Sequence, residues 1–170
     1  MLKIAAAVLA FFCLALSSTS ASAQIFGNGN VYAGVSYGQL TNTVIQQSYR
    51  GWNGSVEDLP FSHLSYLGIT LDASGFYRSG VRQYNVFLGP RISKNYGNWR
   101  PFLHGLAGVR HITSSGLVYN PVTIDVGAGT DYKLSFKNFS WRVQGDFMRS
   151  HYASAYQNDF RASTGLVWRF

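Results

Sequence analysis

Apolar and polar residues alternate with a period of two along most of this chain. That period predicts β-strands whose two faces meet different surroundings. It is unbroken over the last twelve residues, where one face carries Phe160, Ala162, Thr164, Leu166, Trp168 and Phe170. The opposite face carries Asp159, Arg161, Ser163, Gly165, Val167 and Arg169. The alternation separates an apolar face from a charged one but leaves open which of them points inward.

Eight segments of this kind follow residue 29, and most are near the roughly 9 to 11 residues with which a tilted strand crosses a bilayer. We expect strands at Asn30–Leu40, Tyr49–Glu57, His63–Ser74, Arg82–Ser93, Arg100–Ile112, Val122–Leu134, Phe139–Arg149 and Asp159–Phe170. Short turns at Asp58–Ser62, Lys94–Asn98 and Ser135–Asn138 alternate with generally longer, more polar loops. Such an alternation is expected of a barrel with short periplasmic turns and longer external loops.

Residues 1–23 have the features of an export signal. Lys3 supplies a positive start, Ile4–Leu16 forms an apolar core, and Ala21-Ser22-Ala23 matches a cleavage site before Gln24. The core is too short for a spanning helix. We therefore expect one domain over residues 24–170. Cys13, the one cysteine, would be removed with the signal, which leaves no disulfide and no thiolate metal site.

The composition favours a membrane barrel over a soluble sandwich. Aromatic residues make up 16% of the chain and charged residues only 12%, whereas soluble domains carry about 25% charged residues. An apolar solvent must therefore cover part of the surface, yet no apolar run after residue 23 is long enough for a spanning helix. The sequence predicts an all-β fold, an eight-stranded antiparallel up-and-down transmembrane β-barrel.

Most charged residues fall on the face that we place inside the barrel. They are Glu57, Asp72, Asp125, Asp131, Asp146, Arg91, His104, Arg110, Lys133, Arg142, Arg161 and Arg169. Eight strands enclose a space that side chains just fill, and an unpaired buried charge costs several kcal/mol. We therefore predict a closed lumen held by ion pairs among Asp72, Arg91, Arg110, Asp125, Arg142, Asp146 and Arg161.

The expected mature chain is basic and rich in aromatic residues. Without Lys3 the chain has 13 basic and 7 acidic residues, a formal charge of +6. The arginines are scattered, which argues against nucleic acid and suits contact with anionic lipopolysaccharide. Aromatic residues near the strand ends predict two interfacial girdles. One comprises Tyr132, Phe136, Phe139, Trp141, Trp168 and Phe170, and the other Tyr37, Tyr49, Phe76, Tyr77, Tyr152 and Tyr156.

Catalytic candidates are few. His111 lies near Ser114 and Ser115, and His151 near Ser150 and Ser154, at external strand ends, but no positioned acid accompanies either histidine. The four histidines lack metal-ligand spacing, and Gly127-Ala128-Gly129 lies in mid-strand, so we expect no metal, no cofactor and no enzyme. The alternatives are an enzyme acting on lipid A or phospholipid, a small pore, and a soluble lipocalin-like carrier with the apolar face inside.

The C-terminal run Thr164-Gly165-x-x-Trp168-x-Phe170 resembles the recognition signal of bacterial outer-membrane barrels. With the eight alternating segments, it makes residues 24–170 similar to small barrels of the OmpA/OmpX kind. Stretches at 87–91, 101–104 and 143–147 also look similar to uncharacterised single-domain barrels from environmental bacteria. The resemblance implies insertion by the barrel-assembly machinery and a monomer in the outer membrane, in contact with its lipid and lipopolysaccharide.

Overall fold

The computed structural model describes residues 29–41, 46–59, 64–78, 80–114, 116–136, 138–152 and 155–170. The expected export signal lies outside these residues. The strands are β1 (Gly29–Thr41), β2 (Gln46–Asp58), β3 (Leu67–Arg78), β4 (Val81–Ser93), β5 (Trp99–Ser114), β6 (Leu117–Tyr119), β7 (Val122–Lys133), β8 (Phe139–Tyr152) and β9 (Ala155–Arg169). In this part of the chain no helix is long and apolar enough to cross a membrane.

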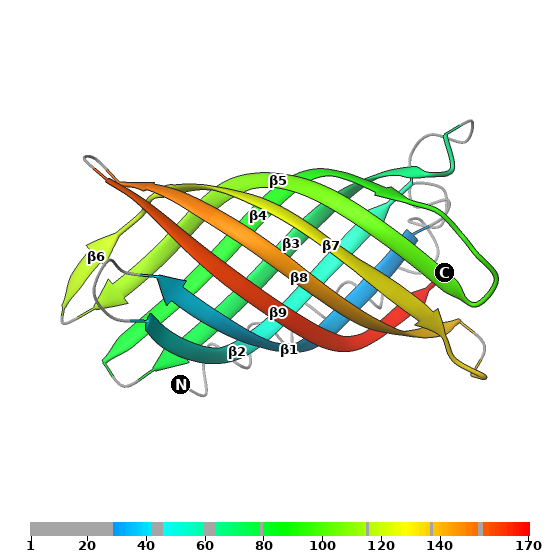
Figure 1. Cartoon of the computed structure of the whole chain (residues 1–170), viewed down its shortest axis with the longest axis horizontal. Coiled ribbons are helices and arrows are strands. Elements are labelled where there is room, and N and C mark those ends of the chain that lie inside the picture. Colours follow the sequence, from blue (N-terminus) through cyan, green and yellow to red (C-terminus); the bar gives the residue numbers. More distant parts are fainter. Residues whose placement is uncertain are drawn as a thin grey trace, which may run out of the picture.

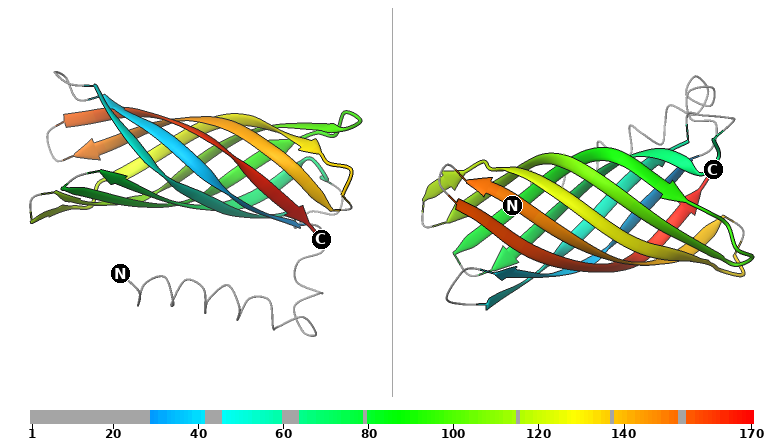
Figure 2. Two further views of the ribbon diagram at one scale, coloured as in Figure 1. Left: turned by 90° about the horizontal axis from the view of Figure 1, so that it is seen from below. Right: turned by 45° about the horizontal axis from the view of Figure 1, so that its top comes forward.

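The eight long strands form one closed antiparallel barrel (Figure 1). Each long strand pairs with its neighbours in sequence, β9 returns to pair with β1, and the β4–β5 pairing completes the circle. The predicted up-and-down barrel is therefore confirmed, and the two further views in Figure 2 show its tilted strands from other sides. Short β6, which the sequence did not predict, pairs with the end of β5 where a loop was expected.

The barrel has two distinguishable ends. At the terminal end, where the Phe170 amide donates a 3.3 Å hydrogen bond to the Gly29 carbonyl, residues 59–66, 94–98 and 134–138 connect the strands. At the far end the connections include residues 42–45, 79–80 and 153–154. The short turns expected at Lys94–Asn98 and Ser135–Asn138 are therefore found, whereas the long far-end loops are not, apart from residues 115–121, which contain β6.

The polar segments at the far end, which were expected to be loops, are strands because their backbone groups remain hydrogen-bonded to the neighbouring strand. Leu40 and Thr41 of β1 still face Gln47 and Gln46 of β2, and Tyr152 faces Ala155. Strand pairing satisfies every backbone donor and acceptor in water as well as in lipid, so polarity alone did not identify a loop. The third strand also begins later than expected, at Leu67, and His63 lies outside the described residues.

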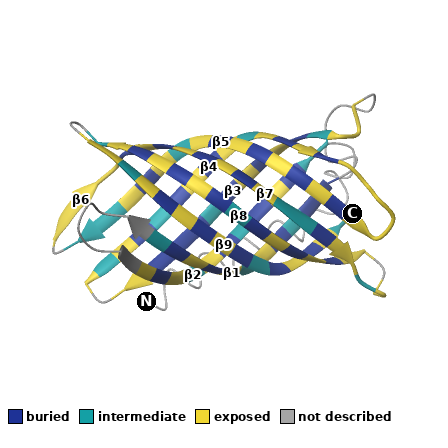
Figure 3. Cartoon of the chain, viewed as in Figure 1, coloured by how far each residue is buried: buried dark blue, intermediate teal, exposed yellow. Residues whose placement is uncertain are grey.

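Burial alternates along the long strands, apart from Ser74–Phe76 of β3, where three successive residues are buried, and this gives the barrel the checkerboard of Figure 3. On β7, Val126 is 58% exposed whereas its neighbour Asp125 is fully buried. The buried positions are mainly polar or charged, and the one apolar cluster among the described buried residues is Phe87, Leu106 and Met148. This arrangement inverts a soluble protein, since the apolar rows face out. The lipocalin-like alternative required the opposite sidedness.

Exposed aromatic residues gather at both ends of the outer face. At the terminal end the rings of Trp99 and Tyr132 lie 4.7 Å apart, and those of Trp168 and Phe170 lie 5.3 Å apart. At the far end three predicted girdle residues are placed differently. Tyr49 and Phe76 are buried inside the barrel, and Tyr152 lies on the inward row of β8 with Met148 and Ser150. Position near a strand end was therefore not sufficient to identify a girdle residue.

Candidate functional site

The centre of the lumen is a four-residue ion network around Arg161 of β9. Its guanidinium contacts Asp72 at 2.9 Å, Asp125 at 3.1 Å and Asp146 at 2.6 Å. Four strands thus place one cation among three carboxylates, and all four side chains are buried. The sequence indicated that these residues share the inward face, and the structure brings them into contact.

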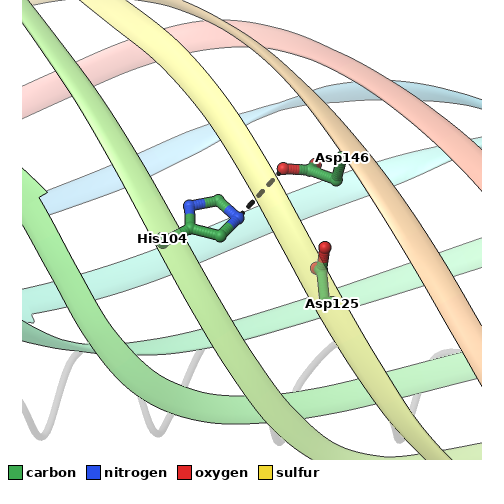
Figure 4. Close-up of side chains that lie close together, drawn as sticks. All are labelled: His104, Asp125 and Asp146. Carbon is green, nitrogen blue, oxygen red and sulfur yellow. Dashed lines mark ion pairs between the residues drawn. The ribbon is translucent and has the colours of Figure 1, made fainter.

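The strand register explains how His104 joins this central layer. His104 of β5, Gly127 of β7 and Asp146 of β8 are direct cross-strand partners in one lateral row. Because Gly127 has no side chain, the flanking groups meet above it, with His104 Nε2 3.1 Å from Asp146 Oδ1. Figure 4 shows these two side chains reaching toward each other, with Asp125 beside them.

A second ion network fills the lumen toward the terminal end. Arg142 forks onto Asp131 with contacts of 2.6 and 3.0 Å, and Arg169 reaches the same carboxylate at 2.9 Å. Glu57 lies 3.4 Å from both Arg91 and Arg100. The Arg91 guanidinium also stacks 3.4 Å from the centre of the Phe102 ring. Below this network a cavity of about 460 Å³ opens at the terminal end.

Toward the far end the lumen contains an apolar cluster and one more ion pair. Arg110 pairs with Asp159 and also lies 3.4 Å from the Met148 sulfur, next to the cluster of Phe87 and Leu106. A gap beside Met148 and Asp159 measures only about 10 Å³, which is room for a single water. The described side chains thus fill the lumen at this level.

Some members of these networks were missing from the predicted ion pairs. Glu57 and Asp131 were predicted to face inward but were not included among the predicted ion pairs. Arg100 and Asp159 lie an even number of residues from inward-facing neighbours on the same strand, so the alternation could have identified them. Lys133 was expected inside, but it is exposed. Lys133 is the last residue of β7, at the terminal end of the barrel. There a side chain on the inward-facing row is no longer covered by the opposite wall.

The formal charges inside the barrel cancel. Six acids (Glu57, Asp72, Asp125, Asp131, Asp146 and Asp159) share the lumen with six arginines (Arg91, Arg100, Arg110, Arg142, Arg161 and Arg169). The seventh acid, Asp58, is half-buried at the terminal end. The excess positive charge therefore lies on the outside, with arginines at the far end (Arg50, Arg78, Arg82 and Arg149) and lysines at the terminal end (Lys94 and Lys133). Lys137 lies outside the described residues.

An outward row of tyrosine and arginine residues crosses three strand pairs near the far end. Tyr37, Arg50, Tyr77 and Arg82 are successive cross-strand partners on β1 to β4, and all are exposed. The Tyr77 hydroxyl accepts a 3.1 Å hydrogen bond from Trp52 Nε1. We call the four residues of this row, together with Trp52, the far rim. Neighbouring strands lie about 4.8 Å apart, so the backbones at Arg50 and Arg82 are roughly 10 Å apart, with Tyr77 between them.

The far rim has no acidic counterpart. Every Asp and Glu of the chain is described, and each is in the lumen or at the terminal end. Among the described residues, none of the ion pairs involves Arg50 or Arg82. A second group at the same end has similar chemistry, with the Arg149 guanidinium 4.4 Å from the centre of the Tyr156 ring and His151 stacked on that ring.

The candidate catalytic pairs are not brought together. Ser150 is fully buried and hydrogen-bonded to Thr123, whereas His151 points outward onto Tyr156. His111 Nδ1 lies 2.7 Å from Asn120 Oδ1, and Ser114 has the opposite parity on the same strand. Ser115 and Ser154 lie outside the described residues. No described carboxylate lies at either rim position, so the described groups do not assemble a Ser, His and acid set.

The residues of the C-terminal signal lie on the strand that closes the barrel. Gly165 faces Gly34 across the β9–β1 seam, where a Cβ would collide with the Ala33 carbonyl oxygen. Thr164 donates a 3.0 Å hydrogen bond to the Arg142 carbonyl. Trp168 and Phe170 are 40% and 42% exposed on the outer face of the terminal end.

A closed eight-stranded barrel with an apolar outer face and a filled, charged lumen is the architecture of small transmembrane barrels. No protein-family model matches the sequence, and no curated protein does either. Solved structures do match. Neisserial surface protein A is similar with a TM-score of 0.70 at 10% identity, over 84% of this chain and 97% of that one.

Two further barrels support the same assignment. The attachment invasion locus protein Ail of Yersinia pestis gives a TM-score of 0.57 at 16% identity, over 85% of this chain and 99% of that one. The N-terminal barrel domain of Pseudomonas aeruginosa OprF gives 0.59 at 14% identity, over 82% and 97%. The chain therefore has the fold of the small eight-stranded outer-membrane barrels.

Proposed function

We propose that this protein is a monomeric, non-enzymatic barrel of the outer membrane that acts in surface interaction, with a closed lumen and a far rim that binds lipopolysaccharide. The observation that carries the proposal is the separation of charge. All acids are inside or at the terminal end, whereas the exposed arginines of the far end have no acidic neighbour.

The closed lumen follows from pairing. A buried guanidinium is tolerated only when its hydrogen-bonding capacity and charge are met, and Arg161 and Arg142 each contact carboxylates at 3.1 Å or less. Opening a pore would break these contacts. The ion networks therefore stabilise the barrel, and the small-pore alternative is disfavoured.

The far rim suits a phosphorylated lipid because it combines charge with aromatic rings. Arginine forks match phosphate geometry, and tyrosine and tryptophan prefer the headgroup depth of a membrane interface. With the termini in the periplasm, as the resemblance to outer-membrane barrels implies, the far end meets the outer leaflet. In that orientation Arg50 and Arg82 would face the lipid A phosphates of the leaflet.

The test compares two double variants with equal changes in charge. Arg50→Gln with Arg82→Gln removes the far-rim charges, and Lys94→Gln with Lys133→Gln removes two charges at the terminal end. Each barrel is purified in detergent, and its binding to immobilised lipopolysaccharide is measured against ionic strength. We expect several-fold weaker, less salt-dependent binding for the arginine variant and unchanged binding for the lysine variant.

Two further reagents test which chemical group is recognised. Lipopolysaccharide lacking the lipid A phosphates should bind the unmodified barrel as weakly as the arginine variant binds the complete lipid. Sucrose octasulfate, the heparin analogue with which Ail has been solved, tests whether any dense anion suffices. Equal loss of binding in both double variants would contradict a site at the far rim.

A further inference from the structure

At the centre of the lumen, Asp125 Oδ1 is buried with no hydrogen-bond partner among the described residues, and it lies beside the His104–Asp146 ion pair, whose Nε2 and Oδ1 atoms are 3.1 Å apart. One donor atom of each residue lies within 4.8 Å of the others. Their side chains come from β5, β7 and β8, and all three residues are at least nine-tenths buried. A buried carboxylate oxygen without a hydrogen-bond partner needs a ligand or an explanation.

We propose that His104, Asp125 and Asp146 form a binding site for one divalent transition-metal ion, with Zn²⁺ as the representative ion. One imidazole nitrogen and two carboxylate oxygens are ligands that such ions accept. Ligands bound at about 2.0 to 2.2 Å in a tetrahedron lie roughly 3.3 Å apart. The 3.1 Å separation of His104 Nε2 and Asp146 Oδ1 matches one edge of that tetrahedron.

The charge of this one layer is negative. Asp72, Asp125 and Asp146 contribute three negative charges, and Arg161 contributes one positive charge, so two negative charges remain. A proton on His104 offsets one of them, whereas a divalent ion beside a neutral imidazole offsets both. The layer therefore attracts a cation locally, although the lumen as a whole contains equal numbers of acids and arginines.

The neighbours of the three residues already hold them in a binding arrangement. Arg161 takes Oδ2 of Asp125 and Oδ2 of Asp146, so each carboxylate turns its other oxygen away from the guanidinium. Outer groups that orient ligands in this way are typical of metal sites. Gly127 completes the arrangement, because a Cβ there would collide with both Asp146 Oδ1 and His104 Nε2.

The closed lumen determines how the ion would enter. Toward the terminal end Arg91 and Arg142 lie across the lumen, and toward the far end the Arg110–Asp159 pair and apolar cluster close it. The ion is therefore taken up while the strands assemble and exchanges slowly afterward. A chelator should remove it from the unfolded chain but not from the closed barrel.

The test uses the chain recovered from outer membranes, unfolded in urea with EDTA and refolded in detergent with Zn²⁺. Refolded barrel is desalted in EDTA, and its zinc content is measured by mass spectrometry, with heat-modifiable gel mobility as the check of folding. We expect about one zinc ion per chain, and at least tenfold less in His104→Gln and Asp125→Asn, since even outer-shell changes cost about 10- to 100-fold.

The matched control is Asp72→Asn, which removes the same charge from the same layer but no ligand, and which should keep most of its zinc. The double variant His111→Gln with His151→Gln controls for exposed histidines and should also keep it. Zinc-free unmodified barrel, or equal zinc in His104→Gln, would overturn the proposal.

If the ligand variants fail to fold, the unmodified barrel still decides the question. Refolding with Co²⁺ should give visible absorption bands of bound cobalt that persist in EDTA. A colourless barrel would overturn the proposal.

Discussion

The inner and outer faces of the same strands use arginine in opposite ways. Inside, Arg161 and Arg142 are fully buried and each contacts carboxylates at short distance. Outside, Arg50 and Arg82 stand exposed beside tyrosine, with every acid of the chain elsewhere. The difference teaches that the net positive charge of this protein comes from its two ends, because the acids and arginines of the lumen are equal in number.

The largest effect is expected from an inward arginine. Arg161→Gln leaves three carboxylates around a neutral amide, and breaking a buried pair costs about 3 to 5 kcal/mol. The unfolding free energy, measured by urea titration in detergent, should fall by that amount. Recovery of stability in the double variant Arg161→Gln with Asp125→Asn would support the charge account, whereas a loss in Arg161→Gln below 1 kcal/mol would contradict it.

The next effect tests the outer face in the middle of the barrel. Val126 is 58% exposed between Asp125 and Gly127, and we place it in the hydrocarbon of the bilayer. Val126→Arg should cost about 2 to 4 kcal/mol in a lipid bilayer, which is the cost of arginine at the midplane. Urea titration in vesicles measures it. A neutral outcome would mean that water, not lipid, covers β7.

A smaller effect on stability, but a clear effect on assembly, is expected at the C-terminus. Phe170 is on the outer face and 42% exposed, so Phe170→Ala leaves the ion networks of the lumen intact, yet the resemblance makes it the residue that the assembly machinery recognises. The amount of folded barrel in the outer membrane should drop several-fold, as measured by quantitative immunoblot. Phe136→Ala, which removes an exposed aromatic outside the last strand, is the control and should assemble normally.

The smallest effect is expected for an outward arginine. Arg149 is exposed on β8 and contacts the Tyr156 ring. Arg149→Gln should change the unfolding free energy by about 0.5 kcal/mol or less, as for most surface substitutions. Arg149→Gln removes the same charge as Arg161→Gln. A comparable loss of unfolding free energy in the two variants would therefore contradict the distinction between the inner and outer faces.

The fold could be predicted from sequence because its main determinant is local. A period of two assigned the inward face of every long strand, including His104 and Arg110 on β5, whose alternation is weak. Strand ends were less predictable, because polar residues beyond the bilayer continue the ladder. The far ends of β8 and β9, taken for a loop at 151–158, pair as far as Tyr152 and Ala155.

The contacts inside the lumen could not be predicted in the same way. They depend on register, and register depends on where each turn begins. The row of His104, Gly127 and Asp146 exists only because three strands align at one level. Parity placed all three inward, but the meeting of an imidazole and a carboxylate over a glycine required the assembled barrel.

One measurement tests the central claim most directly. Nitroxide labels are placed one at a time on residues 122–132 of β7, in a chain whose Cys13 is replaced by Ser, and the reconstituted barrel is probed with oxygen and with a water-soluble nickel chelate. We predict that accessibility to oxygen alternates with a period of two, high at positions such as Ile124 and Val126, while inward positions such as Asp125 are shielded from both reagents. Nickel access to the inward positions, or to the outward ones in mid-strand, would contradict a lipid-facing barrel with a closed lumen.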